Sequence, residues 1–184
     1  MRWLVLPLVA VLAAGCGREA TTPSATSEAF DLPADKVADS IRHVITKDGV
    51  RSADLRSDTA YIYDSERTFD LRGVRVTFYS ETGAEAGELT SKLGDYNMET
   101  GRFVAREDVV LIAEGVNGER RLETEQLIYD VRTDSLSSNR PFTLYEGGRV
   151  SRGTSFRSDT QFRTWEVMGA QTEAIVGESG DVPF

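Results

Sequence analysis

The sequence predicts an all-β protein, an antiparallel β-jelly roll whose two packed sheets are built from repeated hairpin units. The stretch VRVTFY alternates as a half-buried strand does, with Val74, Val76 and Phe78 on one face and Tyr79 on the other. The stretch PFTLY alternates in the same way, and Pro141 suits a strand start because it cannot donate to a ladder. No long run has helical spacing, so roughly ten or more strands are expected.

One unit recurs four times along the chain. Its marker is a residue pair at the end of an apolar stretch, and the copies are spaced 33, 33 and 29 residues apart: Tyr63-Asp64, Tyr96-Asn97, Tyr129-Asp130 and Ser158-Asp159. Each unit reads as short strands joined by turns of Asp, Asn, Ser, Thr, Glu and Gly. The recurring carboxylates are interpreted as turn caps rather than as a catalytic pair, because Asp and Asn bond their own backbone in turns.

The N-terminus has the features of an export signal. MRWLVLPLVAVLAAGCG carries one positive charge, an apolar stretch too short to span a bilayer of roughly 30 Å, and small residues before Cys16. The ending LAAGC is similar to the lipobox of bacterial lipoproteins, in which the signal is cut before the cysteine and the cysteine is acylated. Cys16 is the only cysteine, so it forms no internal disulfide. We expect a signal peptide at 1–15 and lipidation of Cys16.

Composition divides the rest of the chain into three parts. Residues 16–36 are rich in Thr, Ser, Ala and Pro and are expected to form a flexible tether from the lipid. The β-domain is expected at 37–176, followed by a disordered tail at 177–184. Residues 37–46 fit either a short amphipathic helix or a strand that enters a hairpin at Asp48-Gly49, and the hairpin is favoured because everything after it is β in character.

Charge and residue types exclude several functions. The formal net charge of −9 opposes binding to nucleic acid, whose phosphates would be repelled. His43 is the only histidine and has no cysteine or second histidine nearby, so no metal site and no cofactor are predicted. His43 is expected to be a surface or partly buried strand residue, and no serine lies in a Gly-x-Ser-x-Gly elbow. We predict that the protein is not an enzyme.

The order of motifs over roughly residues 40 to 175 resembles LptC, a periplasmic lipopolysaccharide-export family within the OstA-like β-jelly-roll group. The matching stretches are LRSDTAYIYD, then GVRVTFYSETGAEAGELTSKLGDYNMETGRF, and then RLETEQLIYDVRTDSLSSNRPFTLYEGGRVSRGTSFRSD. Two features depart from the family. Its members often begin with a transmembrane helix, whereas this chain has the lipobox, and Ser155 stands where the late motif usually has a second glycine.

The resemblance implies a non-enzymatic carrier that receives lipopolysaccharide from an inner-membrane ABC transporter and passes it along a bridge of similar β-folds to the outer membrane. Acyl chains would lie inside the roll, because exposing a chain of about 14 carbons to water costs roughly 10 kcal/mol. The implied lining comprises Val74, Val76, Phe78, Phe103, Val109, Leu111, Leu127, Leu136, Phe142, Leu144, Phe156 and Trp165.

The implied protein partners are the permease subunits of the transporter and a bridge protein of the same fold, joined by edge-strand addition. The strand near Ile41 to Thr46 is expected to face the transporter, and the last strand, near Val167 to Val176, to face the bridge. Arg42 and Lys47 would protect the first edge if it has no partner.

Alternatives remain open at this point. The apolar face alone predicts a filled core as readily as a cavity, and an envelope lipoprotein that binds only proteins is the second hypothesis. The protein is expected in the periplasm, anchored through Cys16. The family role places the anchor in the inner membrane, whereas Gly17 after the cysteine favours the outer membrane and a bridge component nearer to it.

Overall fold

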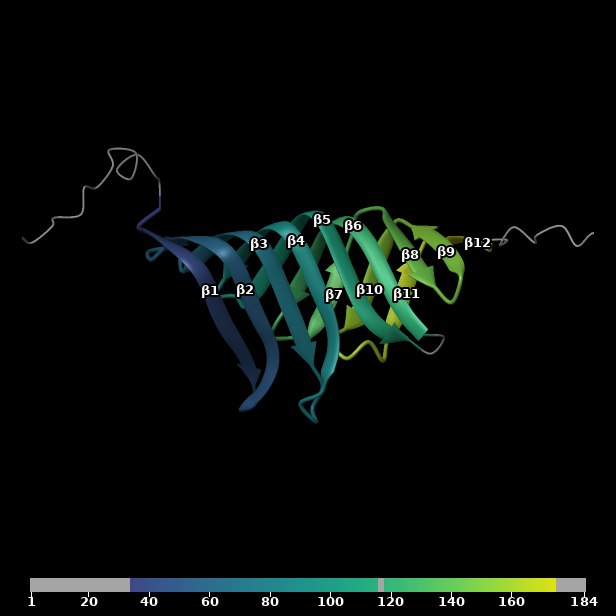
Figure 1. Ribbon diagram of the computed structural model, residues 1–184, viewed down its shortest axis with the longest axis horizontal. Helices are drawn as coiled ribbons and strands as arrows, with labels where there is room; N and C mark the ends of the chain where they lie inside the picture. The colour runs from purple at the N-terminus through teal and green to yellow at the C-terminus, as the bar shows by residue number, and fades with distance from the viewer. Residues whose placement is uncertain (1–33, 116–117, 175–184) are drawn as a thin grey trace, which may run out of the picture. The chain divides into compact units, whose positions relative to one another are not determined.

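The computed structural model describes residues 34–115 and 118–174, and every element in them is a β-strand (Figure 1). The strands are β1 (Lys36–Lys47), β2 (Val50–Tyr63), β3 (Thr68–Tyr79), β4 (Glu85–Asn97), β5 (Arg102–Gly115), β6 (Gly118–Asp130), β7 (Ser135–Ser138), β8 (Phe142–Glu146), β9 (Arg149–Gly153), β10 (Ser155–Asp159), β11 (Trp165–Met168) and β12 (Gln171–Ala174). The predicted signal peptide, acylated cysteine, most of the tether and the tail lie outside the described residues. Within them, no helix suited to crossing a membrane occurs.

The strands form one antiparallel meander. Strands β1–β6 pair in sequence order, and Figure 1 shows them side by side. After β6 the ladder divides, because β8 pairs with the first half of β6 and β7 with its last residues. The division continues: β9 and β12 extend the β8 branch, whereas β10 and β11 extend the β7 branch. The short strands therefore behave as halves of bent strands, and the prediction of an all-β antiparallel roll is confirmed.

Each long strand bends near its middle, so the sheet folds over itself into two layers. Layer 1 comprises residues 41–57, 74–91, 109–115, 118–124, 142–153 and 171–174; layer 2 comprises residues 36–39, 59–72, 93–106, 126–138 and 155–168. The ladder skips residues at each bend, for example between Arg106 and Val109. At this place the register also shifts, and an inserted residue of this kind bends a strand and increases its twist. The sequence-based expectation of short strands was wrong for β1–β6, which have 12 to 14 residues each.

Small polar side chains satisfy the backbone at the bends. The buried hydroxyl of Ser57 donates to the Thr59 carbonyl at 3.2 Å, and that of Ser91 donates to the Leu93 carbonyl at 2.8 Å. These bonds occupy carbonyl groups in a region where the ladder is interrupted. Gly73 has φ +62° and lies so close to Asp58 that a Cβ would meet Oδ2 at 2.0 Å. The positive φ and the nearby Asp58 side chain therefore favour glycine at the bend between β2 and β3.

The 33-residue repeat is explained by the meander, since one period contains two long strands and two turns. Markers Tyr63, Tyr96 and Tyr129 lie at or next to the ends of β2, β4 and β6. Asp130 accepts hydrogen bonds from the backbone amides of Arg132 and Thr133, at 2.9 and 3.0 Å. Asn97 and Asp159 cap their turns in the same way, accepting from the amides of Thr100 and Arg163. Asp64 differs, because its carboxylate pairs with Lys36.

The first segment is a strand, as the favoured alternative predicted. Residues 37–46 lie within β1, and the turn to β2 has φ 52° at Asp48 and 81° at Gly49. Positive φ at both central residues matches the right-handed twist of a two-residue hairpin. Tyr79, expected on the outward face of β3, does not belong to the core cluster. It is nevertheless only 9% exposed, because the Arg51 guanidinium lies over its ring, 3.5 Å from the centroid.

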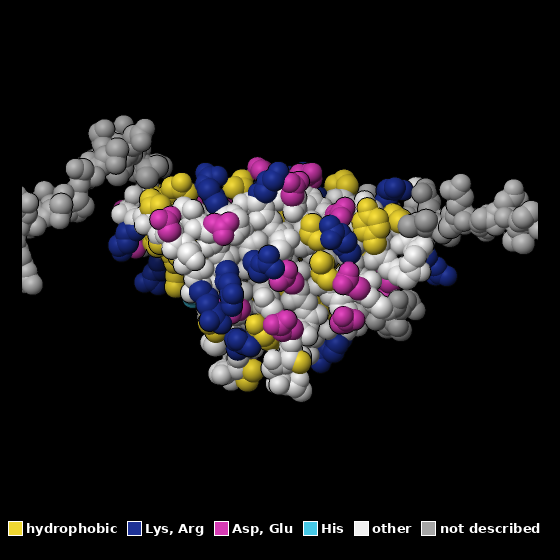
Figure 2. Space-filling view, in the orientation of Figure 1, with side chains coloured by type: hydrophobic (Ala, Val, Ile, Leu, Met, Phe, Trp, Pro, Cys, Tyr) yellow, Lys and Arg dark blue, Asp and Glu magenta, His cyan; other side chains and the backbone are white. Residues whose placement is uncertain are grey.

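An ion pair fastens β1 to β2 on the outward face. The Asp54 side chain is 1% exposed and accepts hydrogen bonds from Arg42 Nε at 3.0 and 2.9 Å and from Arg42 Nη2 at 2.5 Å. Arg56 lies 3.6 Å away and is a cross-strand neighbour of both Arg42 and Arg75. Lys and Arg side chains gather over β1–β3 in Figure 2. Like charges on neighbouring strands repel each other, and the negative charge of Asp54 offsets the repulsion between these arginines.

Replacing Asp54 with asparagine is expected to lower the free energy of unfolding by about 1–2 kcal/mol at pH 7. The Arg42 hydrogen bonds lower the pKa of Asp54 from its usual 3.8, against the opposing effect of burial. The ionised carboxylate therefore stabilises the fold above the ordinary pKa, and this contribution is lost as pH falls through the lowered value. Urea unfolding of both proteins at pH 7 and at about pH 2 checks the prediction; a difference that persists undiminished in acid would contradict it.

Candidate functional site

The predicted lining residues all face the space between the two layers. Eleven of them are 0–7% exposed, and Trp165 is partly buried: Val74, Val76, Phe78, Phe103, Val109, Leu111, Leu127, Leu136, Phe142, Leu144 and Phe156. They come from seven of the twelve described strands: β3, β5, β6, β7, β8, β10 and β11. The same cluster includes buried residues of β1, β2 and β4, so a single apolar surface extends across the roll. The inward position of these side chains agrees with the sequence pattern, but burial alone does not assign lipid binding to them.

Other interior residues were not in the predicted lining. Leu55, Leu71, Leu89 and Leu122 are 0–2% exposed and belong to the same cluster. Their alternation with polar neighbours could have identified them. Phe162 could not be found in this way, because it lies in the turn between β10 and β11 with φ 56°. It is nevertheless 5% exposed.

Aromatic rings connect the two layers inside the roll. Phe78 of layer 1 meets the edge of Tyr129 of layer 2, with ring centroids 5.2 Å apart, and lies 6.1 Å from Phe162. The contacts continue from Phe162 to Trp165 at 6.2 Å, from Trp165 to Phe156 at 4.6 Å and from Phe156 to Phe142 at 6.4 Å. The interior here is filled by side chains, so a ligand would fit between the layers only if they separated.

On the side opposite the bends, the two layers meet along a boundary that we call the seam. It is defined by the turns at 47–52, 80–84, 131–134 and 160–164. Phe162 closes it: its ring lies so close to Gly87 that a Cβ there would meet Cε2 at 2.5 Å. Beside it, Gln161 Nε2 donates to Glu81 Oε1 at 3.3 Å. A cleft of about 250 Å³ lies on the seam between Tyr79, Asp134 and Thr160. Few polar contacts hold the seam, in contrast to the continuous backbone at the bends.

The inward face is only partly covered near β1. Ile41 of β1 is partly buried, and so is Phe69 of β3. His43 lies inward and half-buried, with its ring centroid 5.4 Å from that of Tyr96 in the opposite layer. Burial lowers the pKa of His43 below 6.5, so the imidazole is neutral at pH 7. The expectation of a partly buried strand histidine is confirmed.

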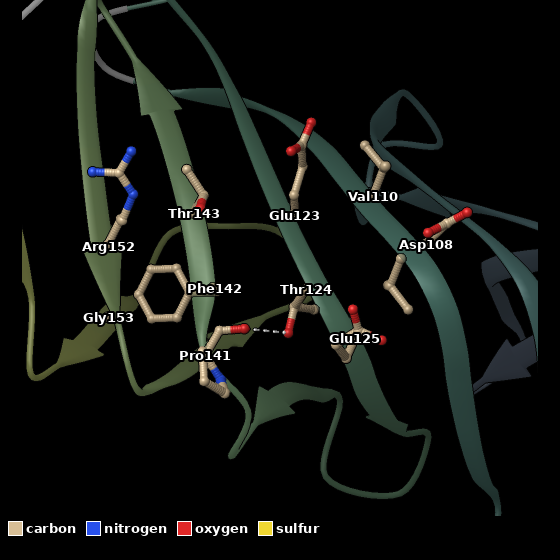
Figure 3. A pocket seen from close by; sticks show the side chains of 11 residues that line it. Asp108, Val110, Glu123, Thr124, Glu125, Pro141, Phe142, Thr143, Arg152 and Gly153 are labelled. Carbon is tan, nitrogen blue, oxygen red and sulfur yellow. Dashed lines mark hydrogen bonds between the residues drawn. The ribbon is translucent and has the colours of Figure 1, made fainter.

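The outward face carries open grooves. One groove, of about 610 Å³, lies on neighbouring strands β5, β6, β8 and β9. Figure 3 shows the side chains that line it. Thr124 Oγ1 donates to the Pro141 carbonyl at 3.0 Å within it. Asp108, one of its carboxylates, is paired with Lys92 at 2.6 Å. Across residues 34–115 and 118–174, no group of three or more metal-ligating side chains is close enough to hold an ion.

The Tyr129 hydroxyl is an unusual feature of the interior. Tyr129 is 0% exposed, and its hydroxyl has no hydrogen-bond partner in the described part of the chain. Burial raises the pKa of Tyr129 to about 12, with a smaller opposite effect of the Ser52 hydroxyl. An unpaired buried hydroxyl costs roughly 1–3 kcal/mol.

Removing this hydroxyl with Tyr129→Phe is therefore expected to raise the free energy of unfolding by about 1 kcal/mol, because the ring contacts remain. Urea unfolding monitored by circular dichroism measures the difference. Tyr145→Phe, on an exposed tyrosine of β8, is the control and is expected to change stability by less than about 0.5 kcal/mol. A loss of more than 1 kcal/mol for Tyr129→Phe would reveal a partner for the hydroxyl.

The fold and its interior define a class of protein: an open, two-layered β-roll with an apolar inside, free strand edges at β1 and at β11–β12, and no metal-ligand cluster among its described residues. Comparison with family models makes this more specific, because the model described as lipopolysaccharide-assembly, LptC-related, matches residues 4–172. The chain belongs to this LptC-related family, as the motif order predicted.

No curated protein matches the sequence significantly. Among solved structures, the chain is similar to the crystal structure of LptH, the LptA homologous periplasmic component of the conserved lipopolysaccharide transport device from Pseudomonas aeruginosa. The sequence identity is 13%, the match covers 72% of this chain and 89% of that chain, and the TM-score is 0.49.

Proposed function

We propose that this protein is a periplasmic, non-enzymatic carrier that receives lipopolysaccharide from an inner-membrane ABC transporter and passes it to a bridge protein of similar fold. The observation that carries the proposal is the family match over residues 4–172, together with an apolar interior built from nearly every strand. A carrier needs a surface that shelters acyl chains without holding them in a deep energy minimum. Twelve inward side chains, from Val74 to Trp165, form the proposed lining of that surface.

The strand edges at the two ends of the meander support the proposed partner contacts by strand addition. Within the part of the chain that the structure describes, strand β1 pairs only with β2, and β11 and β12 each pair with one neighbour, so both ends keep main-chain groups available. Exposed apolar side chains lie at both ends. Val37 and Val44 of β1 are 46% and 45% exposed, and Met168 of β11 is 60% exposed. We assign β1 to the transporter side and β11–β12 to the bridge side.

The membrane anchor is part of the same proposal. Acylation of Cys16 would hold the carrier at a membrane, with the following residues as a tether to β1. Several acyl chains at roughly 0.8 kcal/mol per buried CH2 would make the attachment nearly permanent. Mass spectrometry of the mature N-terminus tests it; an unmodified Cys16 in the envelope fraction would contradict the anchor without affecting the carrier role.

Photo-crosslinking in cells tests lipid carriage. A photoreactive residue in place of Phe142, which is 4% exposed and faces inward, is expected to capture lipopolysaccharide only when ATP is available. The same residue in place of Arg75, which is exposed on the outward face of β3, is the control and is expected to capture none. Capture at Arg75 with none at Phe142 would contradict an internal path.

The close packing of the interior favours a second candidate function, that of an envelope scaffold that binds only proteins through its edges. In that case the rings of Phe78, Tyr129 and Phe162 are simply a core. Depletion separates the candidates: loss of a carrier should block lipopolysaccharide export, whereas loss of a scaffold should leave export intact.

A further inference from the structure

A charged pair faces the inside of the roll at one end of its apolar surface. Arg120 of β6 and Glu146 of β8 are cross-strand partners, and Arg120 Nε donates to Glu146 Oε1 at 2.7 Å. Their side chains are only 13% and 22% exposed. Both share a strand face with buried leucines two residues away, Leu122 at 0% and Leu144 at 7% exposure. The pair therefore belongs to the interior and not to the solvated outer face.

The opposite layer supplies a third group. Trp165 of β11 lies beneath the guanidinium, with Arg120 Cζ 5.1 Å from the ring. Its indole Nε1 is buried and has no hydrogen-bond partner among the described residues. The guanidinium also has N–H groups that lack an acceptor in this part of the chain. Within residues 34–115 and 118–174, Glu146 is its only hydrogen-bond acceptor and accepts only from Nε. The guanidinium and the indole thus lie close together, and both have N–H groups that can donate further hydrogen bonds.

A gain in fold stability does not explain why this ion pair is buried. Removing both charges from water costs several kcal/mol per ion, and apolar residues of similar volume often serve a core as well or better. A guanidinium stacked on an aromatic ring is suited to phosphate, whose oxygens match its planar fork. The apolar interior begins beside the guanidinium. The ring centroid of Trp165 is 4.6 Å from that of Phe156, which is 6.4 Å from that of Phe142.

We propose that Arg120 and Trp165 bind a phosphate group of an acylated amphiphile whose chains occupy the interior next to Phe156. This inference rests on the proposed carrier function and adds a site that fixes the position of the charged end of the cargo. The phosphate accepts hydrogen bonds from the free guanidinium nitrogens and from the indole Nε1. Glu146 holds the guanidinium in place through Nε when the site is empty and competes with the phosphate for its charge.

Fluorescence of Trp165 provides the test. The chain has two tryptophans, so the full-length protein with Trp3→Phe reports on Trp165 alone. It is titrated in mild non-ionic detergent with an acylated disaccharide phosphate, with the same glycolipid after removal of its phosphates, and with inorganic phosphate. Arg120→Gln is expected to weaken binding of the phosphorylated glycolipid about tenfold, equal to about 1.4 kcal/mol, and to leave the dephosphorylated one unaffected.

Matched variants separate this site from a structural ion pair. Arg121→Gln removes the neighbouring exposed arginine, which pairs with Glu123, and is expected to change neither affinity. Glu146→Gln is expected to strengthen binding of the phosphorylated glycolipid, because a competing carboxylate is removed; a purely structural pair predicts no gain. If Arg120→Gln does not fold by circular dichroism, Arg120→Lys keeps the charge without the fork and is expected to weaken binding severalfold.

The outcomes are distinguishable. Equal binding of both glycolipids by the parent protein and by Arg120→Gln would overturn the phosphate site and leave the carrier function standing. No binding of either glycolipid would overturn the carrier function and the site together. Inorganic phosphate binding that depends on Arg120, without any preference between the glycolipids, would overturn the lipid assignment in favour of a free anion.

Discussion

A covalent link across the seam is expected to abolish lipid loading. Glu81 and Gln161 already meet at 3.3 Å, and Phe162 beside them fills the space between the layers. Cysteines at Glu81 and Gln161, joined by a short cleavable reagent, would hold the seam in the closed arrangement. Because the interior rings are in contact, an acyl chain then has no room. Loading is measured as capture of lipopolysaccharide by a photoreactive residue at position 142, and a nearly complete loss is predicted.

Cleavage of the link supplies the control, since it should restore capture in the same sample. Each single-cysteine variant treated with the reagent should load normally. If the linked protein captures lipid as well as the cleaved one does, the acyl chains do not enter between these turns, and the seam is not the opening.

Truncation of Phe78 is expected to have the largest effect on stability. Its side chain is 0% exposed and contacts Tyr129 and Phe162, so Phe78→Ala removes a ring that joins the two layers. Comparable phenylalanine truncations cost about 3–5 kcal/mol, including the cavity left behind. Urea unfolding monitored by circular dichroism gives the value. Thr77→Ala, on the neighbouring outward position of β3, is the control and should cost less than about 1 kcal/mol.

A loss below about 1 kcal/mol for Phe78→Ala would mean that the layers tolerate separation at this point without penalty. It would also imply that the closed interior is only one of several arrangements of similar free energy.

The layering could be predicted from sequence, whereas the bends could not. The two-residue period of a strand is seen in the alternation of Val74, Val76 and Phe78. The period of a pair of bent strands is seen in the 33-residue spacing of Tyr63, Tyr96 and Tyr129. A bend shows itself only as a skipped residue in the ladder, and many polar residues tolerate that position. Short strands were therefore expected where long bent ones occur.

The candidate site was predicted in its apolar part and missed in its polar part. Periodicity finds Phe142 and Leu144 because their neighbours are polar. It does not find Phe162, which reaches the interior from a turn, nor Arg120 and Glu146, which occupy inward positions although they are charged. Their juxtaposition depends on strand register, since β8 pairs with the first half of β6 only after the ladder divides. Register across a divided sheet is a tertiary property.

The central claim is that the two layers separate to admit acyl chains, and a distance between them tests it most directly. Spin labels at exposed Glu85 in layer 1 and exposed Arg102 in layer 2, in a Cys16→Ser background, report that separation by pulsed electron resonance. We predict that the distance distribution shifts to longer values when a saturating acylated glycolipid is bound. An unchanged distribution with the lipid demonstrably bound would contradict the claim and favour a solid core.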